Sequence, residues 1–190
     1  MNDKHRIVSS ESEELILVDQ DDREIGSISK ADAHDGAGVL HRAFSLFLFN
    51  DAGELLLQQR ASGKRLWGGY WSNSCCSHPR RGESMEIATS RRLLDELNFE
   101  AELEFAYHFC YQAQFGDAGS ENELCHVFLG KAIREFEPND NEIEAVRFVS
   151  ADELDAELAD HPERFTPWFK QEWGELQTNY REQLGRYCRL

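Results

Sequence analysis

The chain has 190 residues, of which 41% are hydrophobic and 29% are charged, a composition typical of one folded domain and not of a disordered chain. Its net charge of −16 argues against nucleic acid or an anionic membrane surface as a partner. The longest clear uncharged apolar run, residues 43–49, is too short to span a membrane, and the N-terminus lacks the apolar segment of a signal peptide. We therefore expect a cytoplasmic protein with a single domain over residues 1–190 and a flexible segment at 1–12.

The first half of the chain predicts two antiparallel strand pairs. Residues 15–18 and 24–28 are short apolar runs separated by acidic turn residues, a pattern typical of a hairpin. Residues 43–49 form a near-continuous apolar strand, and a turn at 51–53 returns the chain along 54–60. Residues 31–40, between the two pairs, contain two glycines and are predicted to form a loop that carries His34, with His41 just beyond it.

The segment from Trp71 to Pro79 places a thiol and an imidazole two residues apart. If this segment is extended, Cys76 and His78 point to the same face, while Cys75 points to the other. A thiol beside an imidazole suggests a metal site or a reactive group with a shifted pKa. The alternative is that Cys76 is an ordinary buried cysteine.

The charge of the chain is unevenly distributed. The window from Arg60 to Arg92 holds seven basic residues and two acidic ones, a net charge of +5 inside an acidic protein. Such a basic region around Cys76 and His78 indicates a small anionic ligand, although chance clustering on a solvated face remains an alternative.

A helix is predicted from Ser84, its N-cap, to about Leu97, with Asn98 as the stop signal. Arg92 and Glu96 lie four residues apart and share a face of this helix. They form either a surface ion pair, or an anion-binding arginine beside a carboxylate that holds Mg²⁺ on the same anion.

Strands are expected at about 100–114 and 122–133, and Glu121 and Glu123 fall at the start of the second. At strand spacing the two carboxylates and Cys125 project from one face. Because the two carboxylates lead into an apolar run, a metal or nearby arginines are expected to neutralise them. A further strand is predicted at 142–149 and a short acidic helix at 151–159.

The last predicted helix begins at Thr166 and Pro167, a cap followed by proline at the first helical position. Its apolar stripe is expected to run through Phe169, Trp173, Leu176, Tyr180, Leu184 and Tyr187. Trp168 lies about a quarter-turn or more from this stripe. It is therefore free to face something other than the packing partner of the helix, or it packs in a neighbouring groove.

Three separate segments together supply three imidazoles and two carboxylates, namely His34, His41, His78, Glu121 and Glu123. These are suitable ligands for a divalent metal with near-octahedral geometry. Each segment is weak evidence by itself, and no spacing proves that the three meet in space.

The combination of motifs resembles type I isopentenyl diphosphate isomerase, a family with a Nudix-like fold. The resemblance runs from about Leu15 to the Trp168 helix, and its most specific motifs are residues 73–79, 121–125 and 165–168, with a loop from Ala33 to Ser45 that matches in spacing. It implies a single α+β domain with mixed β-sheets packed between α-helices. It also implies conversion of isopentenyl diphosphate to dimethylallyl diphosphate in isoprenoid biosynthesis.

The resemblance further implies a role for each matching residue. Cys76 and Glu123 match the paired proton-transfer residues, Tyr111 a tyrosine that hydrogen-bonds near the catalytic carboxylate, and Trp168 the tryptophan beside the reacting carbons. The metal ligands match His34, His41, His78, Glu121 and Glu123, and the implied ion is Mn²⁺, Mg²⁺ or Zn²⁺. Positions that hold the diphosphate match Lys30, Arg60, Lys64 and Arg92. Glu96, with the main-chain carbonyl of Cys76, matches the site of a Mg²⁺ bound with the substrate.

The segment from Gly82 to Asn98 also resembles a degraded Nudix box. Arg91 and Glu96 fit, but Arg92 stands where a hydrolase has a metal-binding glutamate, Asp95 replaces another glutamate, and Asn98 replaces the closing glycine. These departures favour the isomerase over the alternative, a Nudix-type diphosphate hydrolase, and a non-catalytic binding protein would leave the opposed acid and base unexplained. The oligomeric state is undetermined, with a monomer as the expectation, and Cys75, Cys110 and Cys188 are interpreted as packing or surface residues.

Overall fold

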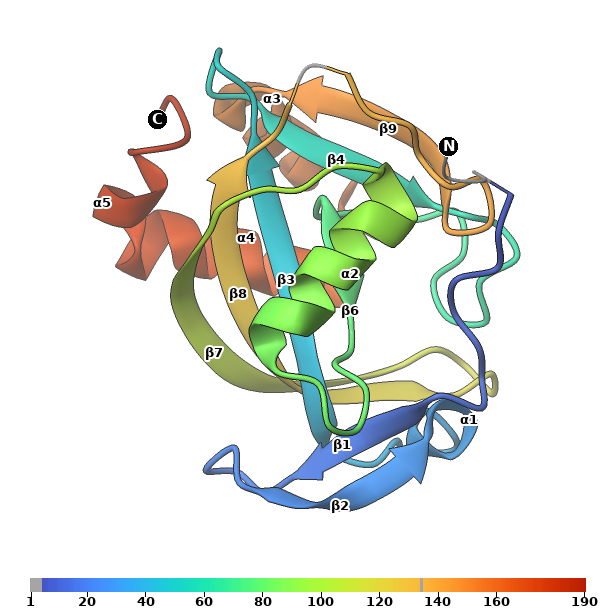
Figure 1. Ribbon diagram of the computed structural model, residues 1–190. Coiled ribbons are helices and arrows are strands. Elements are labelled where there is room, and N and C mark those ends of the chain that lie inside the picture. Colours follow the sequence, from blue (N-terminus) through green and yellow to red (C-terminus); the bar gives the residue numbers. More distant parts are fainter. Residues whose placement is uncertain (1–4, 134) are drawn as a thin grey trace.

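The long strand β3 (His41–Phe49) forms the centre of a mixed sheet in the computed structural model, which describes residues 5–133 and 135–190 (Figure 1). It runs parallel to β8 (Ser120–Lys131) along its whole length. Its antiparallel partners are β1 (Glu14–Val18), β4 (Leu55–Arg60) and β6 (Cys75–Ser77). Because β3 has strands on both sides, residues far apart in the sequence become its neighbours.

The remaining strands extend the sheet through antiparallel pairs. The predicted N-terminal hairpin is present, with β2 (Glu24–Ser29) paired to β1. The strand β7 (Leu103–Gln114) pairs with β8, and β4 pairs with β5 (Trp71–Ser72) and β9 (Ile143–Val149). Strand β8 begins two residues earlier than predicted, so Glu121 and Glu123 both lie inside it.

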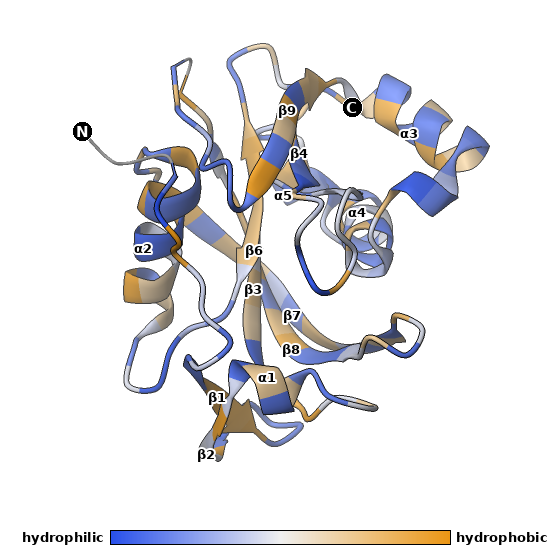
Figure 2. Ribbon diagram, turned by 90° about the vertical axis from the view of Figure 1, so that its right-hand side faces the viewer, coloured by the Kyte–Doolittle hydropathy of each residue, from blue (hydrophilic) through white to orange (hydrophobic). Residues whose placement is uncertain are grey.

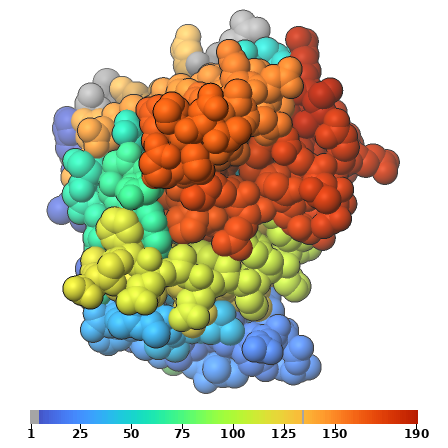
Figure 3. All heavy atoms as spheres, turned by 180° about the vertical axis from the view of Figure 1, so that it is seen from behind, coloured from blue at the N-terminus to red at the C-terminus, as the bar shows by residue number. Residues whose placement is uncertain are grey.

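Helices cover both faces of the sheet (Figures 1 and 2). The helix α2 (Met85–Leu97) packs on one face through Leu93 and Leu97, while α4 (Pro167–Asn179) packs on the other through Phe169 and Trp173, with α3 (Ala151–Asp160) beside it. Seen from behind, the C-terminal helices lie above the β7–β8 segment, with the N-terminal hairpin below (Figure 3).

Burial from both sides is the reason that β3 is continuously apolar over residues 46–49, and the predicted α+β class with a mixed sheet between helices is confirmed.

The local signals of α2 predicted its bounds correctly. The Ser84 hydroxyl accepts a hydrogen bond from the Ile87 amide, and Asn98 adopts the left-handed conformation that ends the helix. Arg92 and Glu96 lie on the buried face of this helix, one turn apart. The predicted alternative of an exposed surface ion pair is therefore wrong, because both side chains are almost fully buried.

Two predictions of local structure need correction. The expected loop at 31–40 begins with one helical turn, α1 (Lys30–Ala33), because the Ser29 hydroxyl caps it at the Asp32 amide. The single C-terminal helix expected through Tyr187 is interrupted at Tyr180, where the backbone leaves the helical conformation and the ring stacks on Tyr107 at 4.6 Å. A separate turn, α5 (Arg181–Leu184), follows, and a short 3₁₀ segment at Pro162–Arg164 precedes α4.

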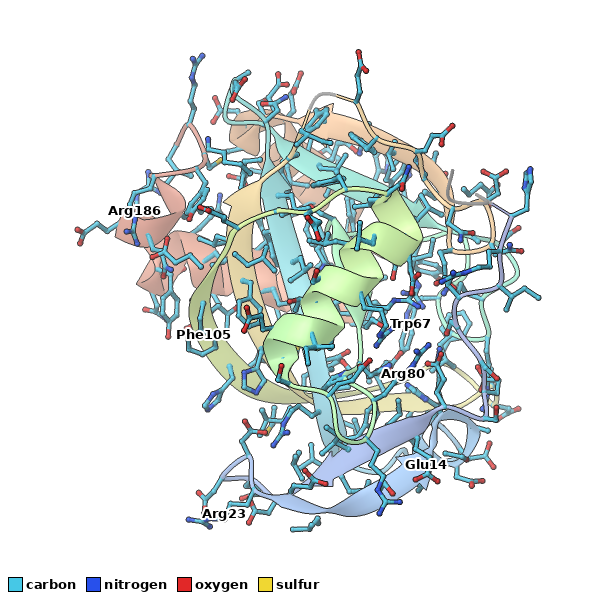
Figure 4. All side chains as sticks on the ribbon, in the orientation of Figure 1. Glu14, Arg23, Trp67, Arg80, Phe105 and Arg186 are labelled. Carbon is cyan, nitrogen blue, oxygen red and sulfur yellow. The ribbon has the colours of Figure 1, made fainter. Side chains whose placement is uncertain are left out.

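The N-terminal segment is partly held against the domain. Residues 1–4 of the predicted flexible segment lie outside the described residues, but Val8 is buried and its carbonyl accepts a hydrogen bond from Arg92. In Figure 4, Glu14 lies on the N-terminal hairpin and Arg80 beside it; Arg80 donates to Glu13 at 2.5 Å. None of the helices in the described part of the chain has the length and apolar character needed to cross a membrane.

Candidate active site

One cavity gathers most of the predicted site residues. Eleven of them line it: Lys30, His34, Arg60, Lys64, Cys76, His78, Arg92, Tyr111, Glu121, Glu123 and Trp168. His41 is fully buried behind the lining, and Glu96 lies behind Arg92. The cavity therefore brings together residues that come from both ends and the middle of the chain.

The three predicted imidazoles meet at one end of the cavity. The ring centroids of His34, His41 and His78 lie 4.8–5.2 Å apart. His34 Nε2 is 2.9 Å from Glu121 Oε2, and His78 Nε2 is 2.6 Å from Glu123 Oε1. One potential ligand atom from each of these five residues lies within 4.8 Å of all the others.

Strand register explains why these side chains converge. His41 pairs with Glu123 across the parallel β3–β8 ladder, and Tyr111 pairs with Glu123 across the antiparallel β7–β8 ladder. Residues directly opposite each other in neighbouring strands project to the same side of a sheet. His34 approaches Glu121 because its carbonyl oxygen packs against Gly119, where a Cβ atom would lie only 2.2 Å away.

The hydrogen bonds of the histidines are suited to metal binding. His34 Nδ1 and His41 Nδ1 each lie 2.7 Å from a backbone carbonyl oxygen, so each holds its proton at Nδ1. The Nε2 atoms then offer lone pairs, and His41 Nε2 is buried without any hydrogen-bond partner. A divalent cation would satisfy this atom and the two buried carboxylates, so the residues fit the metal implied by the sequence.

The two carboxylates have different proton affinities. Burial raises the pKa of Glu121, but the His34 imidazole in its protonated form outweighs burial and holds this pKa at about 2. Burial and the neighbouring Glu121 carboxylate raise the pKa of Glu123 well above its ordinary value. The Tyr111 hydroxyl donates a hydrogen bond of 2.5 Å to Glu123 Oε2, which fixes the orientation of the carboxyl group.

Cys76 and Cys75 point to opposite sides of β6, as predicted. Cys76 lines the cavity, whereas Cys75 is buried among the apolar side chains beneath α2. Burial raises the pKa of the Cys76 thiol to about 12, although the nearby Arg60 opposes the shift. Cys76 therefore carries a proton at neutral pH, and Arg60 Nη1 lies 3.5 Å from its sulfur.

Trp168 forms an aromatic wall of the cavity with its neighbours. Trp168 is 3% exposed, and its ring meets Trp67 edge-on at 5.3 Å and lies 6.1 Å from the Tyr111 ring. The Arg60 guanidinium stands 5.3 Å from the centroid of the Trp168 ring. Arg60, which was expected to hold the diphosphate, thus also contacts both Cys76 and Trp168.

One wall of the cavity is basic. Lys30, Lys64 and Arg92 line it, and two buried carboxylates accompany them. Arg92 donates to Glu96 through Nε at 3.0 Å and through Nη2, and it also donates to Glu142 at 3.0 Å. Glu96, the predicted Mg²⁺ ligand, is therefore engaged by Arg92 in this structure.

Sequence reasoning missed several residues around the cavity. Ser9, Glu11, Ser45 and Arg65 line it, and Glu142 forms an ion pair with Lys64. Each is an ordinary polar or charged residue in its own segment, and no sequence motif marks any of them.

Glu172 was also missed, a fully buried carboxyl group one turn after Trp168. Burial raises its pKa from 4.5 to about 7, while the Ser45 hydroxyl and the Cys125 thiol partly oppose the shift. Cys125 Sγ lies 3.5 Å from Glu172 Oε1, and Glu172 Oε2 has no hydrogen-bond partner.

We expect Glu172→Gln to stabilise the fold more at pH 8 than at pH 5. Because the folded pKa is raised, folding favours the protonated form, so stability is fully present below about pH 4.5 and falls as the pH rises through about 7. The difference corresponds to about 3 kcal/mol, which glutamine avoids because it carries no charge. Thermal melts of the parent and variant at both pH values measure the effect. Glu182→Gln, on exposed α5, is the control, and an equal change at both pH values would contradict the prediction.

Comparison with known proteins places this chain in a class. The family profile described as NUDIX domain matches residues 39–169. The solved structure of DR0079 from Deinococcus radiodurans superimposes with a TM-score of 0.67, covering 93% of this chain and 100% of that one at 24% sequence identity. The chain is thus a Nudix-domain protein, as the fold and sequence motifs predicted.

Curated relatives identify the family within that class. The chain is 41% identical to "Isopentenyl-diphosphate Delta-isomerase 1" of Photorhabdus laumondii, over 90% of this chain and 99% of the relative. It is 45% identical to "Isopentenyl-diphosphate Delta-isomerase" of Burkholderia multivorans, over 83% and 89% respectively. The chain belongs to the isopentenyl-diphosphate Delta-isomerase family.

Proposed function

We propose that this protein interconverts isopentenyl diphosphate and dimethylallyl diphosphate, with Cys76 and Glu123 as the two proton-transfer groups. The observation that supports this most directly is that a protonated thiol and a buried carboxyl group line one cavity. They are carried by β6 and β8, which pair with β3 on its two sides. The reaction itself is inferred from membership of the isopentenyl-diphosphate Delta-isomerase family.

The reaction explains why two such groups are needed. One proton is added to the terminal alkene carbon, which leaves a tertiary carbocation, and another is removed from the carbon on the other side of the cationic centre. An alkene is a weak base, so the donor must be held against it and water must be excluded to prevent capture of the cation. The thiol of Cys76 and the carboxyl of Glu123 are the candidates for these two transfers, in either order.

The His/Glu cluster is proposed to hold a divalent ion, Mn²⁺, Mg²⁺ or Zn²⁺, through His34, His41, His78, Glu121 and Glu123. When bound, the ion supplies positive charge that orients Glu123 and stabilises its ionised form. Tyr111 keeps the carboxyl oriented through its hydrogen bond. Lys30, Lys64, Arg60 and Arg92 are proposed to bind the diphosphate together with Mg²⁺ held by Glu96.

Product analysis tests the proposal. Purified protein with divalent metal is incubated with isopentenyl diphosphate, and the products are separated by chromatography. We expect dimethylallyl diphosphate without release of phosphate. Release of phosphate would favour the hydrolase alternative, against which the engagement of Arg92 by Glu96 and Glu142 argues. Unchanged substrate would indicate a binding protein.

Trp168 provides a prediction for the chemical step. A cation–π contact in a desolvated site is worth about 2 kcal/mol or more. At 1.36 kcal/mol per tenfold, Trp168→Leu should lower kcat by about thirtyfold or more with little change in KM. Trp168→Phe keeps an aromatic face and should retain partial activity, whereas Lys30→Ala should act mainly on KM. Steady-state kinetics with thermal melts provide the measurement, and a Leu variant that turns over like the parent would assign Trp168 to packing alone.

A further inference from the structure

Glu142 places a negative charge inside the basic wall of the cavity. Its Oε2 atom forms ion pairs with both Lys64 Nζ and Arg92 Nη2, the second at 3.0 Å. The Glu142 side chain is only 5% exposed, and that of Arg92 only 2%. The backbone holds it there, because the Glu142 carbonyl accepts a hydrogen bond of 2.9 Å from the Ala61 amide.

The cations of this wall repel one another. Burial, followed by the charges of Lys64 and Arg92, lowers the pKa of Lys30, and the Glu142 carboxylate opposes this shift. Lys64 and Arg92 hold the pKa of Glu142 at about 2 despite its burial. Glu142 is therefore ionised at neutral pH. It neutralises part of the positive charge of Lys64 and Arg92, which would otherwise be available to a diphosphate.

We propose that Glu142 is an internal counter-ion of the diphosphate site, which stabilises the cations in the free enzyme and weakens the binding of substrate and product. This inference rests on the proposed function, because it requires the diphosphate to bind at Lys30, Lys64 and Arg92. Glu142 does not itself line the cavity. It is a positioning residue that acts through Lys64 and Arg92.

The consequence for catalysis follows from the chemistry of the reaction. Substrate and product carry the same diphosphate, so every contact to that group binds both with equal strength. Uniform binding of this kind lowers KM without raising kcat, and very tight binding slows product release. A fixed carboxylate beside the cations limits this affinity while it keeps their side chains in place.

Glu142→Gln separates the charge from the hydrogen bonds, because glutamine retains an acceptor oxygen and nearly the same volume. We expect the variant to bind magnesium-free inorganic pyrophosphate about fivefold more tightly than the parent, or about 1 kcal/mol at 1.4 kcal/mol per tenfold. Its Tm without ligand should be lower than that of the parent, and pyrophosphate should raise it by more. Isothermal titration calorimetry and thermal melts measure both quantities.

Glu144→Gln is the matched control, since it removes the same charge two residues further along the chain. Glu144 is exposed and accepts a hydrogen bond from the Ser62 amide at 3.1 Å, so its variant should bind pyrophosphate like the parent. If Glu142→Gln alone does not fold, the comparison is made between Lys64→Gln and Lys64→Gln/Glu142→Gln, where one cation fewer needs neutralising.

The outcomes separate the inference from the proposed function. If the parent binds pyrophosphate and Glu142→Gln binds it equally or more weakly, the counter-ion role is wrong while the diphosphate site stands. If the parent binds pyrophosphate neither without nor with Mg²⁺, the diphosphate site is wrong, and the inference falls with it. An equal gain in affinity from Glu144→Gln would show an effect of net charge alone.

Discussion

Cys76→Ala is expected to lower kcat by at least about 10³-fold, because it removes a group proposed to transfer a proton in the chemical step. Cys75→Ala is expected to retain most of the activity, since the Cys75 thiol lies on the other side of β6, beneath α2. Both substitutions delete one sulfur atom from the same strand, so they differ only in the face that they alter. Conversion of isopentenyl diphosphate is measured under saturating conditions for both variants and the parent.

Thermal melts accompany this comparison. Cys76 is packed against the core of the α4 side, and Cys75 is fully buried, so each variant loses some packing and should melt slightly below the parent. If the two variants lose activity to the same extent, or if Cys76→Ala is inactive only because it unfolds, the assignment of Cys76 to proton transfer is wrong.

Removal of the metal is expected to abolish turnover and to lower the Tm. The buried carboxylates Glu121 and Glu123 would lose the cation that neutralises them, and a ligand bound only by the folded state stabilises that state. Dialysis against a strong chelator, followed by activity assays, melts and elemental analysis, tests this. Addition of a divalent ion should restore both the activity and the Tm.

His41→Ala should reduce the metal content of the purified protein, because it removes one neutral nitrogen ligand from the cluster. His108→Ala is the control, since His108 is exposed on β7. Full activity in strong chelator, with no metal detected by elemental analysis, would overturn the metal site. Equal metal loss from both histidine variants would show that the cluster is not the binding site.

Much of the fold was predictable because its signals are local. The apolar run of β3, the hairpin of β1 and β2, and the caps Ser84 and Asn98 of α2 each depend on residues a few positions apart. At the C-terminal helix a distant contact outweighed local periodicity, whereas the helical turn α1 was missed although its cap, Ser29, is local. The apolar stripe continues past Tyr180, but the stacking of Tyr180 on Tyr107, far away on β7, accompanies the end of α4.

The candidate site was likewise predictable only where its signals are local. Strand and helix spacing predicted that Cys76 and His78, Glu121 and Glu123, and Arg92 and Glu96 would each share a face, and the structure places each pair so. The family resemblance then supplied the expectation that these pairs meet. Neither source indicated Glu142 or Glu172, which are buried charges without any recognisable motif.

The sequence by itself determined which side chains share a face of each element, because the periods of strands and helices follow from backbone geometry alone. Only the tertiary structure decided which faces meet. The register of β3 with β8 sets His41 beside Glu123, and the register of β3 with β6 sets Ser45 beside Cys76. Fifty residues separate Arg92 from Glu142, and their ion pair exists because the packing of α2 against the start of β9 excludes water from both charges. Burial of this kind depends on the whole fold, and so does the electrostatics of the site.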